Sequence, residues 1–259
     1  GLKCAEALHH LNADITVVDL AYRILPSILD IRAGEIMQKH IEDKGTKFIL
    51  GTSVEQFSKN SAKLTNGDTV DFDILVVAVG VRPNTELVSD AGGKVEKGII
   101  TDLHQQTTLD NVYAAGDCTV SHDCSSNTDR ILALLPNAFM QGEVAGKNMA
   151  GEETLYLNAI PMNAMGFYGR HIITAGSYDG DEDITEDADK EIYKKLVFKD
   201  GLLKGFILMG DVARAGIYTS MIKEQIPLTE VDLDLLREKP QMMMFGKARR
   251  EEKLAGKKH

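Results

Sequence analysis

The sequence predicts an α/β fold followed by a smaller α+β domain, on three observations. Helix-type and strand-type segments alternate in the first part of the chain, which is typical of a parallel sheet covered by helices. That part closes with the apolar run ILVVAV at residues 74–79, as expected of a strand buried on both faces. From residue 155 onward strand-type segments dominate, with turn residues such as Asp200 and Gly201 between them.

Each element of the first part has a local signal. Both helical segments place apolar residues on one face. The first strand, ITVVD, ends on Asp19, and Asn66 and Gly67 predict the hairpin turn of a meander. The elements expected are helices at residues 2–11 and 31–44 and strands at residues 15–19, 47–50, 54–57, 62–65 and 69–72. This order is that of a nucleotide-binding unit that lacks its first strand.

The pattern changes after residue 81. Pro136 suits the first turn of a helix and Gly151 suits its end. The elements expected here are helices at residues 136–149 and 213–224 and strands at residues 98–101, 111–115, 172–175, 193–198 and 205–210. The tail at residues 241–259 is rich in Lys, Arg and Glu, and it is either a docked helix or a frayed end.

Composition excludes several classes of protein. The 259 residues carry a formal net charge of -10, and a negative field repels phosphate backbones, so we expect no nucleic-acid partner. The sequence contains no run of about 18 apolar residues, so no membrane-spanning segment is expected. Three cysteines do not make a disulfide scaffold, which favours a reducing, cytoplasmic location. The chain opens on Gly1 rather than Met, and we expect the true N-terminus to be missing.

The first candidate binding site lies at the start of the chain. Gly1 precedes a helix, where the last glycine of a G-x-G-x-x-G turn would fall, although the chain contains no G-x-G. Asp19 ends the next strand, where a carboxylate takes the adenosine ribose hydroxyls of NAD and repels the extra phosphate of NADP. Arg23 weakens the predicted preference for NAD, because an arginine side chain can bind the extra phosphate of NADP. The alternative for Asp19 is a turn residue at a strand end.

The second candidate site is the segment TTLDNVYAAGD at residues 107–117. Gly116 lets a ligand approach the backbone, and the Asp117 carboxylate can accept strong hydrogen bonds from hydroxyls. The alternative is an ordinary strand followed by a Gly-Asp turn. The helix that begins LPNAFMQGEVAG offers free N–H groups and a partial positive charge at its first turn. Its alternative role is a core helix that buries Phe139 and Met140.

These segments resemble the FAD-dependent pyridine nucleotide-disulfide oxidoreductase superfamily. TTLDNVYAAGD resembles its second FAD motif, whose aspartate holds the ribityl chain. The helix at Pro136, Asn137 and Ala138 resembles the one whose N-terminus points at the flavin. AVGVRPN at residues 78–84 resembles the element that closes the NAD domain, which implies that Gly80 binds the cofactor while Pro83 and Asn84 are structural. Residues 193–218 resemble the terminal domain of NADH:rubredoxin reductases, NADH oxidases and nitrite reductase flavin modules.

The resemblance implies FAD and NAD as cofactors and an incomplete two-dinucleotide-binding-domain (Rossmann-like) flavoprotein fold with a C-terminal α+β domain. The implied parts are an NAD-binding domain at 1–82, the C-terminal part of an FAD-binding domain at 83–152, the α+β domain at 153–240 and the tail at 241–259. The implied function is electron transfer from NADH through FAD to a protein or small-molecule acceptor. The alternative is a non-catalytic fragment or assembly subunit that a second polypeptide completes. A homodimer is left open.

Several other sites are weaker. The redox cysteine pair of the disulfide reductases is absent, and His171 is followed by IITAG without a suitable acid, so a thiol-disulfide reductase of that type is not expected. Cys118 and Cys124 are interpreted as small buried cysteines, with catalysis near the flavin as the alternative. The acidic stretch at residues 179–189 has Ile184 where a calcium loop needs glycine, which predicts a solvated loop. No side chain is predicted as an acid, base or nucleophile.

Overall fold

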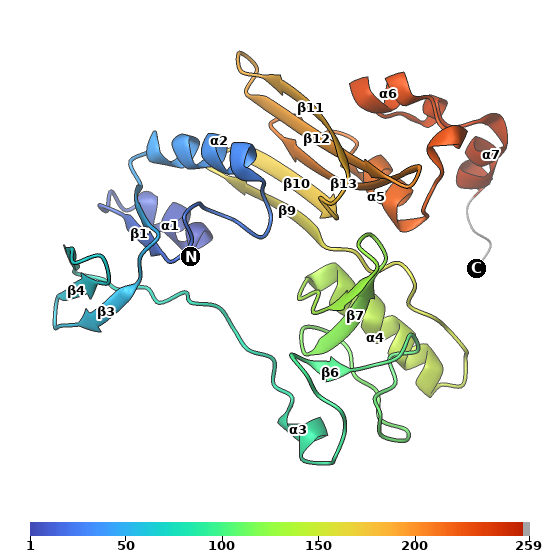
Figure 1. Cartoon of the computed structure of the whole chain (residues 1–259), viewed down its shortest axis with the longest axis horizontal. Coiled ribbons are helices and arrows are strands. Elements are labelled where there is room, and N and C mark those ends of the chain that lie inside the picture. Colours follow the sequence, from blue (N-terminus) through green and yellow to red (C-terminus); the bar gives the residue numbers. More distant parts are fainter. Residues whose placement is uncertain (256–259) are drawn as a thin grey trace. The chain divides into compact units, whose positions relative to one another are not determined.

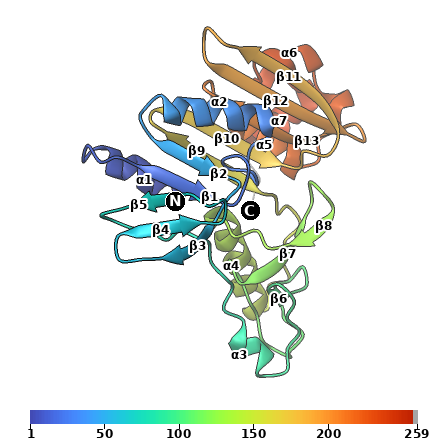
Figure 2. The same cartoon turned by 60° about the vertical axis from the view of Figure 1, so that its left-hand side comes forward.

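The computed structural model describes residues 1–255, which form two compact units (Figures 1 and 2). The first unit contains Gly1–Val81 and Met165–His171, the tip of a later hairpin. The second contains Arg82–Ala164 and the chain from Ile172 onward. Each unit has its own core, and each is described separately.

The first unit begins with two helices and two parallel strands. Its elements are α1 (Leu2–His9), β1 (Thr16–Asp19), α2 (Ile31–Glu42) and β2 (Lys47–Leu50), close to the ranges that the sequence predicts. The register pairs Asp19 with Leu50, so both strands end together. Helix α2 starts where the Asp30 side chain accepts a hydrogen bond of 2.9 Å from the Ala33 N–H, and it buries Met37 and Ile41.

The predicted meander follows as a three-stranded antiparallel sheet (Figure 2). Its strands are β3 (Val54–Phe57), β4 (Ser61–Leu64) and β5 (Thr69–Asp71). The side-chain Oδ1 atom of Asn66 accepts a hydrogen bond of 3.1 Å from the Asp68 N–H, which closes the turn that the Asn-Gly pair predicts.

The strand predicted at residues 74–79 is wrong for this structure. The run is plain coil in Figure 1, and its side chains face solvent, with Val77 64% exposed and Val79 90% exposed. A buried parallel strand needs a hydrogen-bonded neighbour and a covering layer. Among the described residues, β1 and β2 pair only with each other, and no strand pairs with the run. An apolar segment without a neighbour stays extended and unpaired.

The second unit opens with a short helix, a small sheet and a long helix. The elements are α3 (Glu86–Ser89), β6 (Ile99–Ile100), β7 (Thr119–Asp123), β8 (Thr128–Arg130) and α4 (Leu135–Met149). Strand β6 runs parallel to β7, and β7 runs antiparallel to β8.

The strand predicted at residues 111–115 is also wrong. Asn111 has φ 61°, a left-handed conformation that interrupts an extended chain, and Tyr113 makes only an isolated bridge to Gln106. The segment therefore reaches Gly116 as a loop, and no ladder holds it from either side among the described residues.

A five-stranded antiparallel sheet follows, and all of it except the tip of the β9–β10 hairpin belongs to the second unit. Its order is β11-β12-β13-β10-β9, and helix α5 follows it in the chain (Figure 1). The bounds are β9 (Met162–Phe167), β10 (Arg170–Gly176), β11 (Asp181–Asp187), β12 (Ile192–Lys199), β13 (Leu202–Met209) and α5 (Ala215–Lys223).

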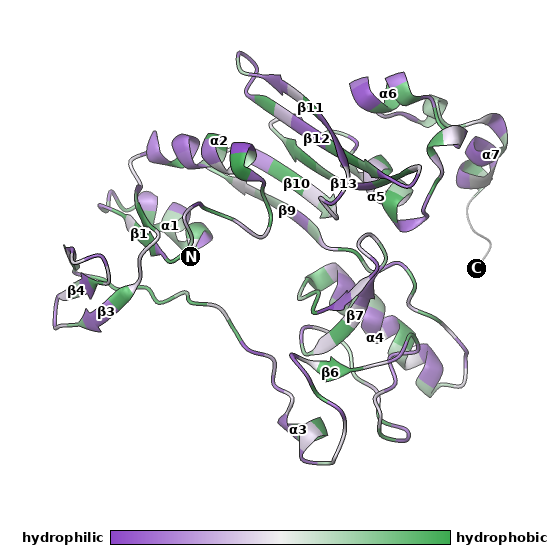
Figure 3. Cartoon of the chain, viewed as in Figure 1, coloured by the Kyte–Doolittle hydropathy of each residue, from purple (hydrophilic) through white to green (hydrophobic). Residues whose placement is uncertain are grey.

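Strand β11 corrects the prediction of a solvated acidic loop. Its seven residues pair with β12, from Asp181 opposite Phe198 to Asp187 opposite Ile192. The acids remain mostly exposed, because β11 is the edge of the sheet, and charged side chains there discourage pairing with another chain. Figure 3 shows the contrast between hydrophilic β11 and hydrophobic β13. The acidic composition of this stretch therefore predicted the exposure of its side chains correctly, but it did not predict that the backbone forms a strand.

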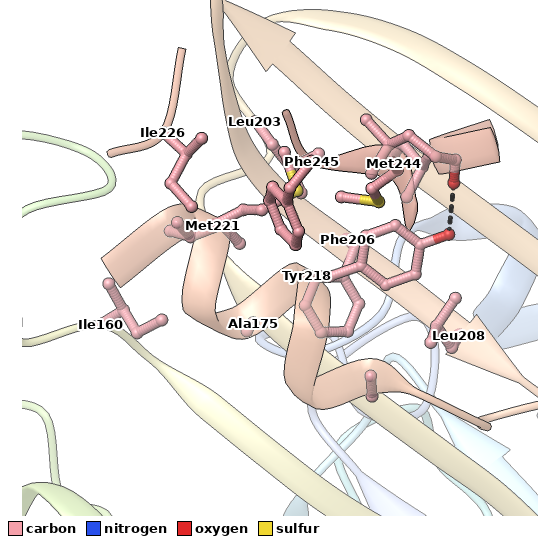
Figure 4. Close-up of a cluster of buried hydrophobic side chains, with 14 of the residues drawn as sticks. Ile160, Ala175, Leu203, Phe206, Leu208, Tyr218, Met221, Ile226, Met244 and Phe245 are labelled. Carbon is pink, nitrogen blue, oxygen red and sulfur yellow. Dashed lines mark hydrogen bonds between the residues drawn. The ribbon is translucent and has the colours of Figure 1, made fainter. Parts of the chain in front are cut away.

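The tail is docked rather than frayed. Helix α6 (Leu233–Glu238) precedes it, and the tail itself forms a 3-10 turn at Met242–Met244 and α7 (Lys247–Ala255). Its last four residues lie outside the described part. Met244 and Phe245 enter the main core, where Phe206 and Tyr218 pack with ring centroids 5.3 Å apart (Figure 4). The Tyr218 hydroxyl donates to the Leu236 carbonyl at 2.8 Å, which ties α6, just before the tail, to the same core.

Candidate cofactor-binding sites

The Gly116–Asp117 turn lies directly on the first turn of α4. Gly116 has φ +90°, and a Cβ built on it would come within 3.7 Å of the Ala138 Cβ. Its N–H donates to the Oε1 atom of Gln141 at 2.5 Å. The structure thus brings together the two segments that the sequence analysis assigned to one site.

Gln141 is the residue that sequence reasoning missed. It is buried, and its Oε1 atom also accepts from the Thr119 hydroxyl at 3.2 Å. Its Nε2 atom donates to the Ser121 hydroxyl. One amide therefore fixes the turn and the start of β7 to α4. The available signal was a glutamine on the apolar side of a helix, where a buried amide requires partners.

The first turn of α4 is open to a ligand. Leu134 precedes the helix without a side-chain cap, and Pro136 occupies the first turn. The leading N–H groups of a helix have no intrahelical acceptors, so they can bind an electron-rich group. Phe139 is 72% exposed, which corrects the alternative of a core role, whereas Met140 does pack against a buried cluster.

The Asn137 side chain serves the fold. It is fully buried, donates to the Ile160 carbonyl at 3.0 Å and accepts from the Tyr156 hydroxyl at 3.0 Å. Its amide group is thus committed, and only its backbone N–H is left for a cofactor. The predicted cofactor contact of Asn137 is therefore limited to its backbone N–H group.

The acid and thiols near the turn differ in exposure. Asp117 is exposed, and no hydrogen bond or ion pair to its carboxylate occurs within the described residues. Cys118 is half-exposed, contrary to the expectation of a buried cysteine, and its Sγ atom lies 3.5 Å from the Ala115 carbonyl oxygen. Cys124 is buried, and burial, reinforced by Asp123, raises the pKa of its thiol, so it is not primed as a thiolate.

The second candidate site is at the carboxyl end of β1, in the first unit. Asp19 accepts a hydrogen bond of 2.8 Å from the Ala21 N–H through Oδ1, which leaves Oδ2 free to meet hydroxyls. Two backbone bonds tie this end to β2, from the Gly51 N–H to the Ala21 carbonyl at 3.0 Å and from the Thr52 N–H to the Asp19 carbonyl at 3.2 Å. The carboxylate is therefore held on a rigid loop.

Arg23 is engaged within its own loop. Its guanidinium donates to the Pro26 carbonyl at 3.0 Å and to the Leu29 carbonyl, with a weaker contact of 3.4 Å to the Asp30 carbonyl. These bonds direct the charge toward backbone oxygens rather than toward a ligand phosphate. Arg23, which weakened the predicted preference for NAD over NADP, is thus held by bonds within its own loop.

Gly1 and the run that contains Gly80 approach each other. The Gly1 carbonyl accepts from the Cys4 N–H at 2.9 Å, and a Cβ on Gly1 would lie 3.7 Å from the Ala78 Cβ. Gly80 has φ +92° and open space around it. The predicted residues thus fall into two groups, with Gly1, Asp19 and Gly80 in the first unit and the remainder in the second.

Comparisons with known proteins identify the family. The model of pyridine nucleotide-disulphide oxidoreductases matches residues 1–142, more than half of the chain. The chain belongs to this family. The model of the rubredoxin NAD+ reductase C-terminal domain matches residues 161–226, which confirms the resemblance assigned to the C-terminal region.

Individual relatives agree with the family. The epsilon subunit of NADH-dependent phenylglyoxylate dehydrogenase from Aromatoleum evansii is 32% identical, covering 88% of this chain and 57% of its own length. Rubredoxin-NAD(+) reductase from Acinetobacter baylyi is 29% identical, covering 91% and 58%. The chain therefore spans a little over half of these relatives.

Solved structures confirm the fold class. An NAD-dependent persulfide reductase from A. fulgidus matches with a TM-score of 0.79 and 25% identity, covering 89% of this chain and 48% of that one. A putidaredoxin reductase in covalent complex with putidaredoxin matches with a TM-score of 0.81 at 20% identity, covering 92% and 58%.

Two kinds of feature are absent from the described residues. No helix there is long and apolar enough to cross a membrane. No group of three or more His, Cys, Asp or Glu side chains there could hold a metal ion.

Proposed function

We propose that the full protein containing this chain transfers electrons from NADH, through FAD, to a redox acceptor. The observation that carries the proposal is the Gly116–Asp117 turn, fixed on the open first turn of α4 by Gln141. Membership of the family supports FAD and NAD(H) as the cofactors. The proposed organisation keeps an NAD-binding part at 1–82, an FAD-binding part at 83–152 and a C-terminal domain at 153–240.

The residues of the turn fit an FAD. The exposed Asp117 carboxylate is suited to accept hydrogen bonds from ribityl hydroxyls, and Gly116 lets the chain pass close to the cofactor. The N-terminus of α4 at Pro136, Asn137 and Ala138 would face the electron-rich pyrimidine edge. The bound flavin supplies the redox chemistry, and this chain binds and orients it.

Asp19 is proposed to hold the adenosine ribose of NAD. Its free carboxylate oxygen is suited to the ribose hydroxyls and would repel the additional phosphate of NADP. Since Arg23 is bonded to loop carbonyls, it does not compensate for that repulsion in this arrangement. Gly1 and Gly80 complete the proposed NAD site.

The acceptor is proposed to be a small redox protein or a small molecule. Relatives named rubredoxin-NAD(+) reductase and NADH oxidase support both kinds. A cytoplasmic location is part of this proposal, which leaves a homodimer open.

One observation favours a second candidate. The apolar run at residues 74–81 is exposed, and the two-stranded β1–β2 sheet leaves edges open. A chain with such surfaces can act as a subunit that a second polypeptide completes. The intact mass and visible absorption of the purified 259-residue chain distinguish the two roles. A yellow protein that NADH bleaches would eliminate this second candidate.

The primary test replaces Asp117 by Ala in the full protein. We expect loss of FAD on dialysis, because hydrogen bonds to charged groups contribute about 1.5–3 kcal/mol each. Flavin content per protein, from the visible spectrum, is the measurement. Asp110→Ala is the matched control, since Asp110 is also an exposed acid of this segment. Equal flavin retention by both variants would remove Asp117 from the site.

A further inference from the structure

Tyr22 is an exposed aromatic residue beside the proposed NAD site. It follows Asp19 by three residues, on the loop that leaves β1, and it is 89% exposed. Its neighbour Leu20 is 71% exposed. Tyr22 and Leu20 thus expose apolar surface at the strand end where the cofactor is proposed to bind.

Gly51 determines where the Tyr22 ring lies. Gly51 follows Leu50, the residue that pairs with Asp19, and it has φ +71°. A Cβ on Gly51 would lie 2.6 Å from the Cε1 atom of Tyr22 and 2.7 Å from its Cδ1 atom, which is closer than atoms can approach. The ring therefore rests against a backbone position that only glycine leaves open.

The backbone holds this arrangement in place. The Gly51 N–H donates to the Ala21 carbonyl at 3.0 Å, and the Thr52 N–H donates to the Asp19 carbonyl at 3.2 Å. These bonds tie the residues that precede Tyr22 to the end of β2, and Arg23, which follows it, is bonded to carbonyls of its own loop. The ring thus presents its outward face from a fixed loop, which reduces the ordering cost of binding.

We infer that Tyr22 is the platform on which the adenine ring of the dinucleotide stacks. The inference rests on the proposed role of Asp19. Adenine is attached to the ribose that Asp19 would bind, so it must lie within a few ångströms of this loop. A flat purine and an exposed phenol ring are matched in size, and stacking between them needs no hydrogen bond. Tyr22 is a positioning residue for the cofactor and takes no part in the chemistry.

The test measures binding directly, with the flavin-loaded full protein. Calorimetry with ADP-ribose reports on the adenosine end without any reaction, and its dissociation constant is compared across variants. For Tyr22→Ala we expect a dissociation constant between about fivefold and about a hundredfold higher, the range of base–aromatic stacking. Tyr22→Phe keeps the ring and should bind as the unaltered protein does. Leu20→Ala is the control for loss of a neighbouring exposed side chain.

A kinetic comparison separates adenine from the rest of the cofactor. Reduced nicotinamide mononucleotide lacks adenine, so Tyr22→Ala should lower the preference for NADH over this donor by the same factor as in calorimetry. Equal weakening of both donors would overturn the inference, because Tyr22 would then act on the whole site.

The failure of the inference is distinguishable from the failure of the proposed function. If Tyr22→Ala binds ADP-ribose within twofold of the unaltered protein while Asp19→Asn binds more weakly, the platform is wrong and the NAD site stands. If the unaltered protein binds neither ADP-ribose nor NADH, the proposed function fails and the inference fails with it.

Discussion

Two apolar runs of this chain have opposite outcomes. Residues 74–79 are exposed coil, whereas β13, at Leu202–Met209, is almost wholly buried. The difference lies in their neighbours. Strand β13 pairs with β12 on one edge and β10 on the other, and α5 contributes to the core beside it. An apolar run therefore indicates that a segment requires burial, but it does not specify the partner that supplies it.

The same contrast separates the two candidate sites. The turn at Gly116 is held by Gln141 within one unit, so its geometry is complete around the α4 N-terminus. The site at Asp19 has an ordered loop, yet it faces a sheet of only two parallel strands. Three experiments test the contrast between buried and exposed parts of the chain, from the largest expected effect to the smallest.

The largest effect is expected from truncating Phe206, which is fully buried against Tyr218. Phe206→Ala should lower the free energy of unfolding by about 3–5 kcal/mol, because a cavity replaces a core ring. Val77→Ala, in the exposed run, should change it by less than about 0.5 kcal/mol. Urea unfolding followed by circular dichroism measures both. A Val77→Ala loss similar to that of Phe206→Ala would mean that the run is buried.

An intermediate effect concerns alkaline stability. Burial raises the pKa of Tyr218 above its value of about 10 in an unfolded chain. The unfolded state then releases its phenol proton first, so this stabilisation is complete below about pH 10 and declines as pH rises toward the folded-state pKa. Tyr218→Phe should lose about 1–2 kcal/mol at neutral pH, since the Leu236 carbonyl loses its donor, and should decline less above pH 10.

Unfolding midpoints at pH 8, 10 and 11 provide the measurement for Tyr218. Burial also raises the pKa of Tyr156, so Tyr156→Phe should reduce the alkaline decline in the same direction. An identical alkaline decline in the unaltered protein and both variants would contradict the burial of these phenols.

The smallest effect is expected at the tail. Lys253, whose side chain is 18% exposed, pairs with Glu224 at 2.9 Å, and its Nζ atom lies 5.4 Å from the centre of the Phe245 ring. Lys253→Ala should cost no more than about 1 kcal/mol, and less at high salt, because water and ions screen such pairs. Limited proteolysis of the tail, with Phe245→Ala as the comparison, measures whether docking depends on the core residue. A larger loss from Lys253→Ala than from Phe245→Ala would assign the docking to the ion pair instead.

Local signals predicted the elements that are stabilised locally. The Asn66 turn and the proline of α4 each act within a few residues, so the β4–β5 hairpin and α4 were placed correctly. Residues 74–79 and 111–115 failed because a strand exists only through a distant neighbour. Strand β11 was missed for the opposite reason, since pairing with β12 overrides a composition typical of a loop.

The candidate site shows the same division. Gly116 and Pro136 were recognised because their backbone requirements appear in the sequence. Gln141 was missed because its three partners come from positions far along the chain. The two hydrogen bonds that occupy the Asn137 side chain could not be anticipated either, since Tyr156 and Ile160 lie next to it only in the folded chain.

The core shown in Figure 4 also constrains how the protein is made. Its members extend from Cys124 to Phe245, and Leu236, Met244 and Phe245 close it. A ribosome must therefore synthesise residues beyond Phe245 before this core can be completed. Until then the faces of β13 and α5 that await the tail are exposed on the nascent chain, which makes that interval a period of exposure to chaperones and to aggregation.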